Sequence, residues 1–230
     1  MKFCNKILLY LIFCSFSMSE NIEYIYDVEI KGISIITGTV GKCNFKIKND
    51  LDNFEMSIIT QTTKLASLIY PYKDKIKMKI DSNYSLLLLE QNISNINKKL
   101  KVVVDKINRK ILRNDKELNF YSDTLFSPYS FIHYLKEKKI ELNQIHTYNI
   151  FDNRKIQKIK FEVNKIEKIK VPYGTYECLY VKPNHDKNLI KNNGSIELWY
   201  TNDSEKIPLK INLETKIGTF ILKLNKIIIS

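Results

Sequence analysis

Residues that break regular structure are scarce in this sequence. Only 6 of the 230 residues are Gly and 5 are Pro, which excludes collagen-like chains and disordered chains rich in Pro and Gly. Cys and His are also few, at 4 and 3 residues, and neither a CxxC nor an HxxxH spacing occurs. The spacing therefore predicts no zinc site. His133 is interpreted as a half-buried helix residue and His185 as part of an exposed loop.

Sequence motifs of the common enzyme classes are lacking as well. We find no GxSxG nucleophile elbow, no Gly-rich phosphate loop and no HExxH motif. Carboxylates are plentiful, but an antiparallel sheet brings many of them together, so no pair stands out as an acid/base couple. We therefore expect no catalytic residue and no cofactor, and the sequence does not predict an enzyme.

The abundant residues describe an ordered and basic protein. Hydrophobic residues make up 44% of the chain and charged residues 27%, with 14 Tyr and 11 Phe, which is typical of a globular protein of one domain. The 37 Lys and Arg exceed the 25 Asp and Glu by a formal charge of +12, which favours anionic lipid or polymer as a partner. A nucleic-acid partner is not expected, because the Lys residues alternate with carboxylates along most predicted strands.

The N-terminus has the order of a secretory signal peptide. Lys2 and Lys6 precede the apolar run Ile7–Phe13, and small residues follow before a predicted cleavage between Ser19 and Glu20. A permanent membrane anchor is the alternative, but the run is too short to span a hydrocarbon core of roughly 30 Å. We expect residues 1–19 to be the signal and the mature chain to lie in the periplasm or outer envelope, without a transmembrane helix.

The cysteines leave two alternatives open. Cys14 follows the apolar run and could be a lipidated N-terminus, although Phe13 is larger than the residue that normally precedes a lipidated Cys. Cys43 and Cys178 remain in the mature chain, where an export route permits a disulfide between them. The other interpretation, which we favour, is two partly buried free thiols.

Alternation of apolar and polar residues dominates the mature chain. In Tyr24–Lys31 one face carries the apolar residues and the other carries the charges, and in 75–80 Lys alternates with Ile and Met. Fourteen segments have this pattern and are expected to give about twelve strands, because some should merge: Tyr24–Lys31, Ile33–Val40, Phe45–Lys48, Phe54–Thr60, 75–80, Leu86–Gln91, Leu100–Asp105, Lys110–Arg113, Gln157–Val163, Lys165–Val171, Tyr176–Lys182, Ser195–Thr201, Ile207–Thr215 and Gly218–Leu224. The tail Lys226–Ser230 is either a last strand or a frayed end.

Two segments have helical periodicity instead. Thr63–Tyr70 has an apolar stripe and ends before Pro71, and a second helix begins with Ser127 as N-cap, continues with Pro128 and carries Phe131 on its apolar stripe. The predicted fold is mainly β: residues 20–230 form a single β-rich domain with one strongly curved antiparallel sheet, half-barrel or barrel-like, and one or two short helices.

An ordered succession of short motifs resembles an exported bacterial family, the domain-of-unknown-function family numbered 3108. The motifs are Tyr26–Val28, Gly32, Gly38, Leu65–Leu68, Val104–Asp105, Asp123, Val171–Cys178, Ile196–Asp203, Ile207–Ile211 and Ile217–Thr219. The resemblance covers nearly all of the mature chain. It implies a strongly curved antiparallel sheet in the cell envelope, without an assigned reaction.

The positions that carry the resemblance have structural explanations. They are Asp27, Gly32, Asp123, Gly174, Trp199, Asp203, Pro208 and Gly218. Gly174 suits a turn, Asp203 can close an Asx-turn, and Pro208 suits the start of a strand, where its missing N–H is tolerated. The alternation places Trp199 on the face opposite Leu198, where we expect partial burial with a partner for the indole N–H.

Two functional hypotheses follow. A curled sheet with an apolar concave face can bind an apolar or amphiphilic envelope molecule such as a lipid. Alternatively the protein is a structural or assembly factor that holds another envelope protein through a sheet edge. An enzyme with no recognisable motif is the third and weakest interpretation. The deciding feature is whether the concave face is open or is filled by Thr63–Tyr70 and Phe126–Glu137.

Overall fold

The structure is a computed structural model that describes residues 21–32, 38–50, 53–114, 116–152, 155–183, 195–215 and 218–230. The predicted signal peptide with its cleavage site and Cys14 lies outside them, as do His185 and most of the predicted strand Ile33–Val40.

Within the described residues, fourteen antiparallel strands form one open sheet, in the order β8-β7-β6-β5-β4-β3-β2-β1-β14-β13-β12-β11-β10-β9. The strands are β1 Asn21–Lys31, β2 Thr39–Asp50, β3 Asn53–Thr62, β4 Lys73–Asp81, β5 Leu86–Ile93, β6 Lys98–Asp105, β7 Lys110–Arg113, β8 Lys116–Asn119, β9 Ile145–Phe151, β10 Ile156–Val171, β11 Gly174–Pro183, β12 Ile196–Thr201, β13 Pro208–Thr215 and β14 Gly218–Ile229. The helices are α1 Lys64–Ser67, the 3-10 turn η1 Ser94–Ile96 and α2 Pro128–Lys136. The predicted fold class is confirmed.

The first and last strands meet in the middle of the sheet. β1 pairs with β14 along its whole length, and two backbone hydrogen bonds join Asn21 and Ser230, at 2.9 and 3.0 Å. The tail of the chain is therefore a strand and not a frayed end. Every other pair of neighbouring strands is consecutive in the sequence.

Alternation gives the sheet a dry face and a wet face. Tyr24, Tyr26 and Val28 of β1 are buried, and the register places Phe45 and Cys43 of β2 beside the two tyrosines. β4 shows the same pattern, with its lysines exposed and its Ile and Met residues buried. We call the face that contacts α2 the inner face and the opposite one the outer face. This alternation was correctly predicted.

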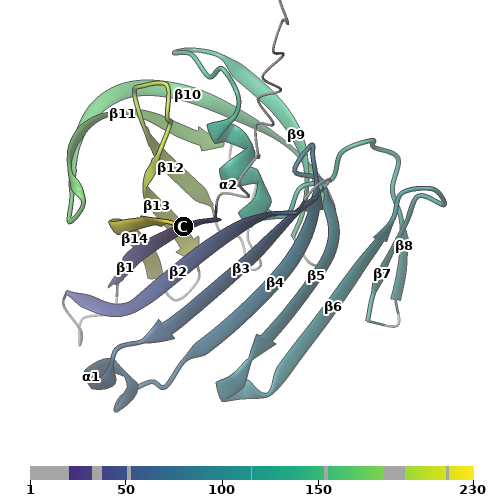
Figure 1. The fold of residues 1–230 in the computed structure, drawn as a ribbon, viewed down its shortest axis with the longest axis horizontal. Coiled ribbons are helices and arrows are strands. Elements are labelled where there is room, and N and C mark those ends of the chain that lie inside the picture. Colours follow the sequence, from purple (N-terminus) through teal and green to yellow (C-terminus); the bar gives the residue numbers. More distant parts are fainter. Residues whose placement is uncertain are drawn as a thin grey trace, which may run out of the picture.

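Bulges bend the sheet around the inner face. The register shifts between Val28 and Glu29, between Lys79 and Ile80, and between Val163 and Lys165. An extra residue in one strand of a pair increases the local twist and bends that strand. As a result β9–β13 arch over α2 from one side while β2–β6 lie on the other (Figure 1).

The segment before α2 joins the two sides of the arch by a seam of hydrogen bonds. Leu125 receives a hydrogen bond from the Leu86 N–H at 2.7 Å and donates its own N–H to the Ser85 hydroxyl at 2.9 Å. Phe126 donates to the Asn149 carbonyl at 3.0 Å and accepts from the Phe151 N–H at 2.8 Å. One short piece of chain therefore connects the start of β5 with the end of β9, although β8 and β9 themselves do not pair.

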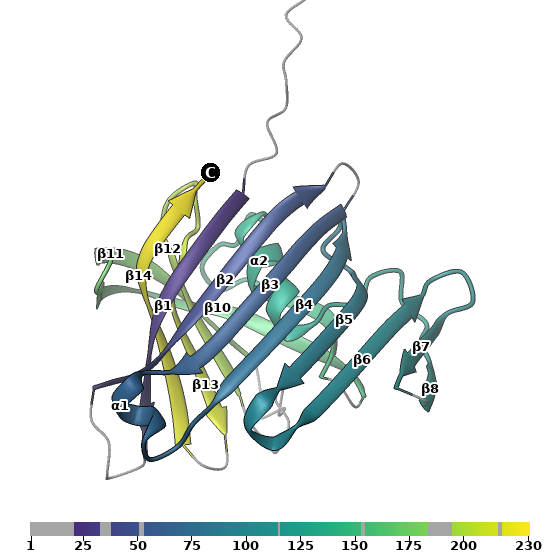
Figure 2. The same cartoon turned by 60° about the horizontal axis from the view of Figure 1, so that its bottom comes forward.

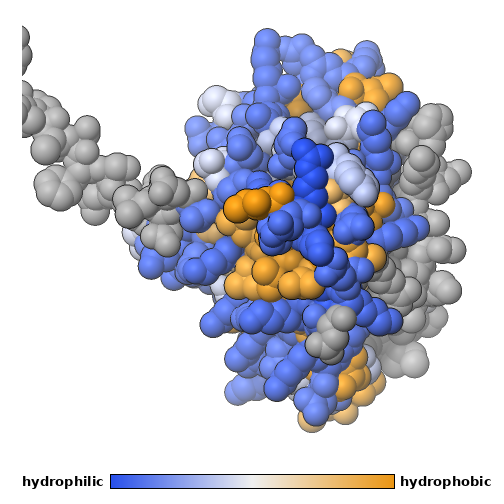
Figure 3. Space-filling view, turned by 90° about the vertical axis from the view of Figure 1, so that its right-hand side faces the viewer, coloured by the Kyte–Doolittle hydropathy of each residue, from blue (hydrophilic) through white to orange (hydrophobic). Residues whose placement is uncertain are grey.

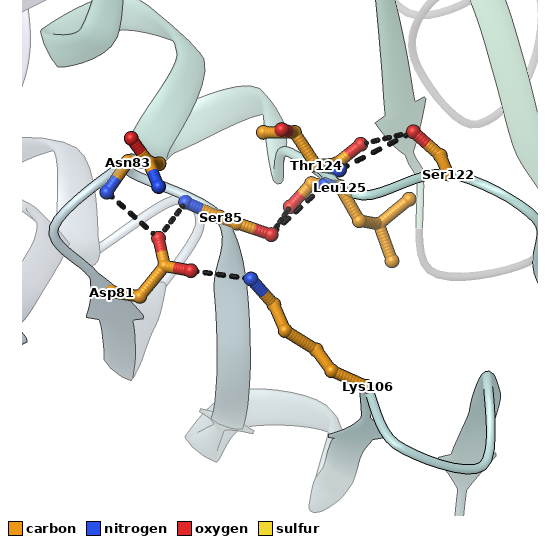
Figure 4. A network of polar contacts seen from close by, with 7 residues as sticks. All are labelled: Asp81, Asn83, Ser85, Lys106, Ser122, Thr124 and Leu125. Carbon is orange, nitrogen blue, oxygen red and sulfur yellow. Dashed lines mark hydrogen bonds and ion pairs between the residues drawn. The ribbon is translucent and has the colours of Figure 1, made fainter.

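Side chains support this seam, as Figure 4 shows. One oxygen of Asp81 accepts from the backbone N–H groups of Asn83 and Ser85, both at 2.9 Å, and the other accepts from the Lys106 ammonium. On the far side of Leu125, the Ser122 hydroxyl bonds the Thr124 carbonyl at 2.7 Å.

The strand predictions were incomplete in two places. Lys116–Asn119 and Ile145–Phe151 form β8 and β9, which were not predicted because β8 is four residues long and because β9 ends in two adjacent buried residues, Ile150 and Phe151. The predicted strands Gln157–Val163 and Lys165–Val171 are one strand, β10. The bulge near Asn164 shifts the phase of the alternation there, which made the strand look like two.

The first predicted helix is also shorter than expected. α1 covers only Lys64–Ser67, and its buried residue is Ala66, not the predicted apolar stripe. Leu65, Leu68 and Ile69 are exposed. The predicted stripe was wrong because a single turn docked through a small residue at its centre leaves its large side chains on the outside.

Candidate functional site

Helix α2 occupies the inner face of the curved sheet. The N-cap predicted at Ser127 is confirmed: its hydroxyl accepts from the Ser130 N–H at 3.0 Å, and the Ser130 hydroxyl accepts from the Ser127 N–H at 3.1 Å. Phe131 is fully buried, with its ring centroid 4.4 Å from that of Phe161. Tyr200, in the opposite wall, donates its hydroxyl to the carbonyl of Ile132 in the helix at 2.7 Å. The inner face is thus filled by α2, while α1 lies away from it at one end of the sheet (Figure 2).

His133 belongs to this filling and not to a catalytic site. Its ring centroid lies 4.4 Å from that of Phe45 and 5.4 Å from that of Tyr24, and the residue is only 2% exposed. Nε2 has no hydrogen-bond partner. Burial lowers the pKa of His133 to about 3, so the ring is neutral at physiological pH. The predicted half-burial was wrong because α2 is covered on both sides by the arch.

Asp74 is the one carboxylate among the buried residues of the described chain. One oxygen accepts from the Gln91 amide at 2.7 Å and from the Tyr72 hydroxyl at 3.3 Å, while the other has no partner. Burial raises the pKa of Asp74, against the opposing effect of these two hydrogen bonds. Sequence reasoning missed it, although its position in β4 gave a signal: Asp74 shares the apolar face with Ile76 and Met78.

The two mature cysteines lie on opposite faces of the sheet. Cys43 is on the inner face, where the Thr60 hydroxyl donates to its sulfur at 3.3 Å. Cys178 is on the outer face of β11, because its neighbour Leu179 pairs with the inward-pointing Tyr200. Both are free and buried, and burial raises the pKa of each thiol to about 11. The favoured interpretation of two free thiols is therefore confirmed, and neither has the low pKa of a nucleophile.

Trp199 is covered on the outer face by a cluster of polar residues. Its indole N–H donates to Glu167 at 2.6 Å, the Lys210 ammonium lies 4.0 Å from the ring centroid, and Tyr180 stacks on it at 4.8 Å. Lys165 holds the other oxygen of Glu167 at 2.7 Å. Hydrogen bonds from Lys165 and then Trp199 lower the pKa of Glu167. The predicted face and N–H partner are confirmed, and at 5% exposure the burial is greater than predicted.

Two of the predicted glycines meet where β1 and β14 pair. Gly32 and Gly218 have φ angles of +96° and +137°, a region that side chains disfavour. A Cβ on Gly218 would lie 2.5 Å from the Lys31 carbonyl oxygen. At the turn before β11, Gly174 has φ +154°, and a Cβ there would lie 2.7 Å from the Tyr176 ring. These glycines shape turns and close approaches and do not line a site.

The remaining predicted positions lie apart from one another. Asp27 on β1 accepts from Asn225 at 2.7 Å. Asp203 closes a turn by accepting from the N–H groups of Glu205 and Lys206, at 3.0 and 3.1 Å. The carbonyl of Pro208 accepts from the buried Tyr26 hydroxyl at 2.9 Å.

Asp123 is exposed in the loop before α2. The structure therefore does not gather the eight predicted positions into one centre.

A shallow groove of about 310 Å³ lies on the outer face over β2–β5. Its polar lining is Lys46, Lys48, Lys77, Lys79, Glu55 and Glu90. Glu55 pairs with Lys79 at 3.5 Å and Glu90 pairs with Lys101 at 3.4 Å. Ser57, Met56, Met78 and Leu88 complete the lining, so the groove combines charged and apolar side chains.

Other chemistry is limited by what the described residues bring together. Among them, no three His, Cys, Asp or Glu side chains gather in a way that could hold a metal ion. No helix in the described part of the chain is long and apolar enough to cross a membrane.

On the side that carries β6–β8, apolar residues are bordered by polar ones (Figure 3).

The sequence analysis did not predict one further exposed apolar surface, at the end of the sheet where α1 lies. Leu65, Leu68, Ile69 and Tyr70, together with Ile96 of η1, are between 57% and 82% exposed. We call these five residues the apolar tip. The signal for exposure was present in the sequence, because a helix that ends before Pro71 is too short to bury a stripe of large side chains.

Comparisons with known proteins agree with this picture of a fold without an assigned reaction. The model of a family described as a protein of unknown function, DUF3108, matches residues 25–225. No curated protein matches the chain. A crystal structure of a beta-barrel-like protein of the domain of unknown function DUF1849 from Brucella abortus is 12% identical, with a TM-score of 0.59, over 91% of this chain and 98% of that one. This similarity supports the fold.

A second solved structure is less similar. It is that of a predicted lipoprotein from Parabacteroides distasonis, 12% identical over 91% of this chain and 96% of that one, with a TM-score of 0.36. That TM-score is too low to establish a common fold.

Proposed function

The chain belongs to the family of unknown function DUF3108, and from that premise we propose that it is an exported, non-enzymatic protein of the cell envelope that holds another envelope protein. The supporting observation is the filled inner face. Phe131, Ile132 and His133 of α2 pack under the arch, so described side chains of the protein itself cover the part of the inner face around the helix. The working surface is therefore an edge or the outside of the sheet.

The edge of β9 is the best candidate for the contact. The Asn149 carbonyl and the Phe151 N–H point away from β10 and bond Phe126. By alternation, the backbone groups of Ile145 and Thr147 point the same way, and nothing in the described chain pairs with them. Ile145 is also exposed. An extended segment of a partner protein can add to this edge as a further strand.

The opposite edge is less suitable. β8 has four residues, and Lys116 and Glu117 are both exposed. Short, charged edge strands discourage pairing with another chain. The proposal therefore places the partner on β9.

Site-specific photo-crosslinking in the cells that produce the protein tests this contact. A photoreactive residue at position 147 should give one crosslinked product. When the photoreactive residue is placed at position 145 instead, Thr147→Ile should preserve the product and Thr147→Pro should abolish it. The matched control is Lys77, which is exposed but lies on β4 between two paired strands. The proposal fails if positions 77 and 147 give the same products. It also fails if the purified protein binds a labelled fatty acid saturably while position 147 gives no product.

Export has its own test. N-terminal sequencing and intact mass of protein recovered from the envelope should place the first residue at Glu20 or within a few residues of it. A chain that retains Met1 would contradict export by signal cleavage. If the first residue found is instead a lipid-modified Cys14, the exported protein is a lipoprotein.

A further inference from the structure

The apolar tip is built by two loops at one end of the sheet. Four of its residues, Leu65, Leu68, Ile69 and Tyr70, belong to α1 and the chain that leads into β4, and the fifth, Ile96, belongs to η1 between β5 and β6. A hydrogen bond of 3.4 Å from the Asn95 amide to the Tyr70 hydroxyl joins the two loops. Both loops lie at the same end of the strands in both ribbon views (Figures 1 and 2).

The loops are held in a defined conformation while their large side chains remain outside. The Thr63 hydroxyl caps α1 by accepting from the Ala66 N–H at 3.3 Å, and the Thr63 N–H is bound by the Val40 carbonyl at 2.9 Å. Behind the tip, Thr62 and Tyr72 exchange hydrogen bonds. The exposure of the tip therefore does not come from local unfolding. Folding docks Ala66 and presents its large neighbours to the surroundings.

The charge around the tip has one sign. Lys64, Lys73 and Lys99 are exposed beside it, and residues 62–73 and 92–99 contain no Asp or Glu. The nearest carboxylate in the sequence, Asp74, is buried on the inner face. Large apolar side chains on two loops that carry lysines and no carboxylate match the interface of a bilayer that contains anionic lipid. Tyr70, with a ring and a polar hydroxyl, is typical of that interface.

A second copy of the chain fits the tip less well. In a symmetric contact the same patch would face itself, and Lys64, Lys73 and Lys99 would approach their own copies without a carboxylate between them. We propose that the apolar tip inserts into the interfacial layer of an anionic bilayer, with these three lysines on the lipid headgroups. This inference is independent of the partner on the β9 edge.

Insertion can be read directly with a fluorescent reporter in the full chain. Leu68→Trp places an indole in the tip. Ile107→Trp is the matched control, because Ile107 is 93% exposed in the turn at the opposite end of β6. Trp199 is the same in both variants and lies on the outer face. With vesicles of phosphatidylethanolamine and phosphatidylglycerol that carry brominated acyl chains, we expect strong quenching of Leu68→Trp and none in Ile107→Trp beyond the wild-type chain.

Partitioning of the protein between water and vesicles measures how much the leucines and the lysines each contribute to membrane binding. The double variant Leu65→Ser/Leu68→Ser should lower the partition coefficient on these vesicles about tenfold or more, from the lost burial of two leucines. Ile107→Ser should leave it unchanged. Lys64→Glu/Lys99→Glu should weaken binding to the anionic vesicles and make it less sensitive to added salt than binding of the wild-type chain.

Three outcomes would overturn the proposal. Equal quenching of the two Trp variants would mean that the tip does not insert. Equal binding to vesicles of phosphatidylcholine alone would remove the role of the lysines. A dimer in sedimentation that Leu68→Ser dissociates would assign the tip to a second copy of the chain.

Discussion

The ring of His133 is buried against the rings of Tyr24 and Phe45, and its Nε2 has no hydrogen-bond partner. This burial makes the free energy of unfolding depend on pH. The pKa of His133 is about 3 in the folded state against 6.5 for the ordinary side chain. Because the folded pKa is lowered, the stabilising contribution is complete above pH 6.5 and is lost as the pH falls toward 3. Each unit by which the pH falls in that window lowers the free energy of unfolding by about 1.4 kcal/mol through this one residue.

His133→Phe should therefore flatten the dependence of stability on pH between 6.5 and 3. Phe fits a site lined by Tyr24 and Phe45, and it removes the unpartnered nitrogen. The measurement is urea unfolding at a series of pH values. Ser57→Ala, which removes no titratable group from the outer face of β3, is the control and should keep the wild-type slope. Identical slopes for wild type and His133→Phe would show that folding does not shift the pKa of His133.

Trp199 offers a second prediction at this scale, because it is the one Trp in the sequence. Its emission should lie to the blue of free indole with little quenching by iodide, since Glu167, Lys210 and Tyr180 cover the ring. Glu167→Ala should shift the emission to the red by freeing the indole N–H. Glu177→Ala, an exposed carboxylate on the neighbouring strand, should leave it unchanged. An unshifted spectrum in Glu167→Ala would argue against this cover.

At the scale of the element, α2 combines a strong cap with a buried stripe. Ser127→Ala removes the acceptor for the Ser130 N–H and should cost about 1 kcal/mol. Phe131→Ala removes a fully buried ring and should cost about 3 to 5 kcal/mol. Chemical denaturation measures both. Equal small costs would mean that α2 is not packed under the arch.

The elements also show where sequence reasoning succeeds. Alternation in β1 and β4 and the cap of α2 are local patterns, and they predicted the strands, the faces and the helix start correctly. α1 has the same kind of local pattern, but whether Leu65 and Leu68 are covered depends on what lies across from them. No described residue covers them, and the one local signal for this was the shortness of a helix that must end before Pro71. The hydroxyl bond of Tyr200 to α2 likewise depends on what lies across from it and was outside the reach of the sequence, whereas the burial of Asp74 had a local signal in its place on the apolar face of β4.

At the scale of the whole molecule, the seam holds the two sides of the arch together. Ser85→Ala leaves the N–H of the buried Leu125 without its acceptor and should cost about 1 to 3 kcal/mol. Hydrogen exchange should become faster at Leu86 and Leu125 together. Ser57→Ala, on the outer face of β3, is the control and should change stability by no more than about 0.5 kcal/mol. Unchanged exchange at the seam in Ser85→Ala would remove its role in joining β5 to β9.

The central pairing of β1 with β14 decides when the protein can fold. Glu29 and Lys223, 194 residues apart, form an ion pair at 2.7 Å across this pair. The meanders β2–β8 and β9–β13 contain only neighbours in sequence, so each can begin as soon as it leaves the ribosome. The two can be joined through the middle of the sheet only after the last dozen residues have been made. Contacts of such high order form slowly, so the pairing of β1 with β14 is expected to be a late step in folding.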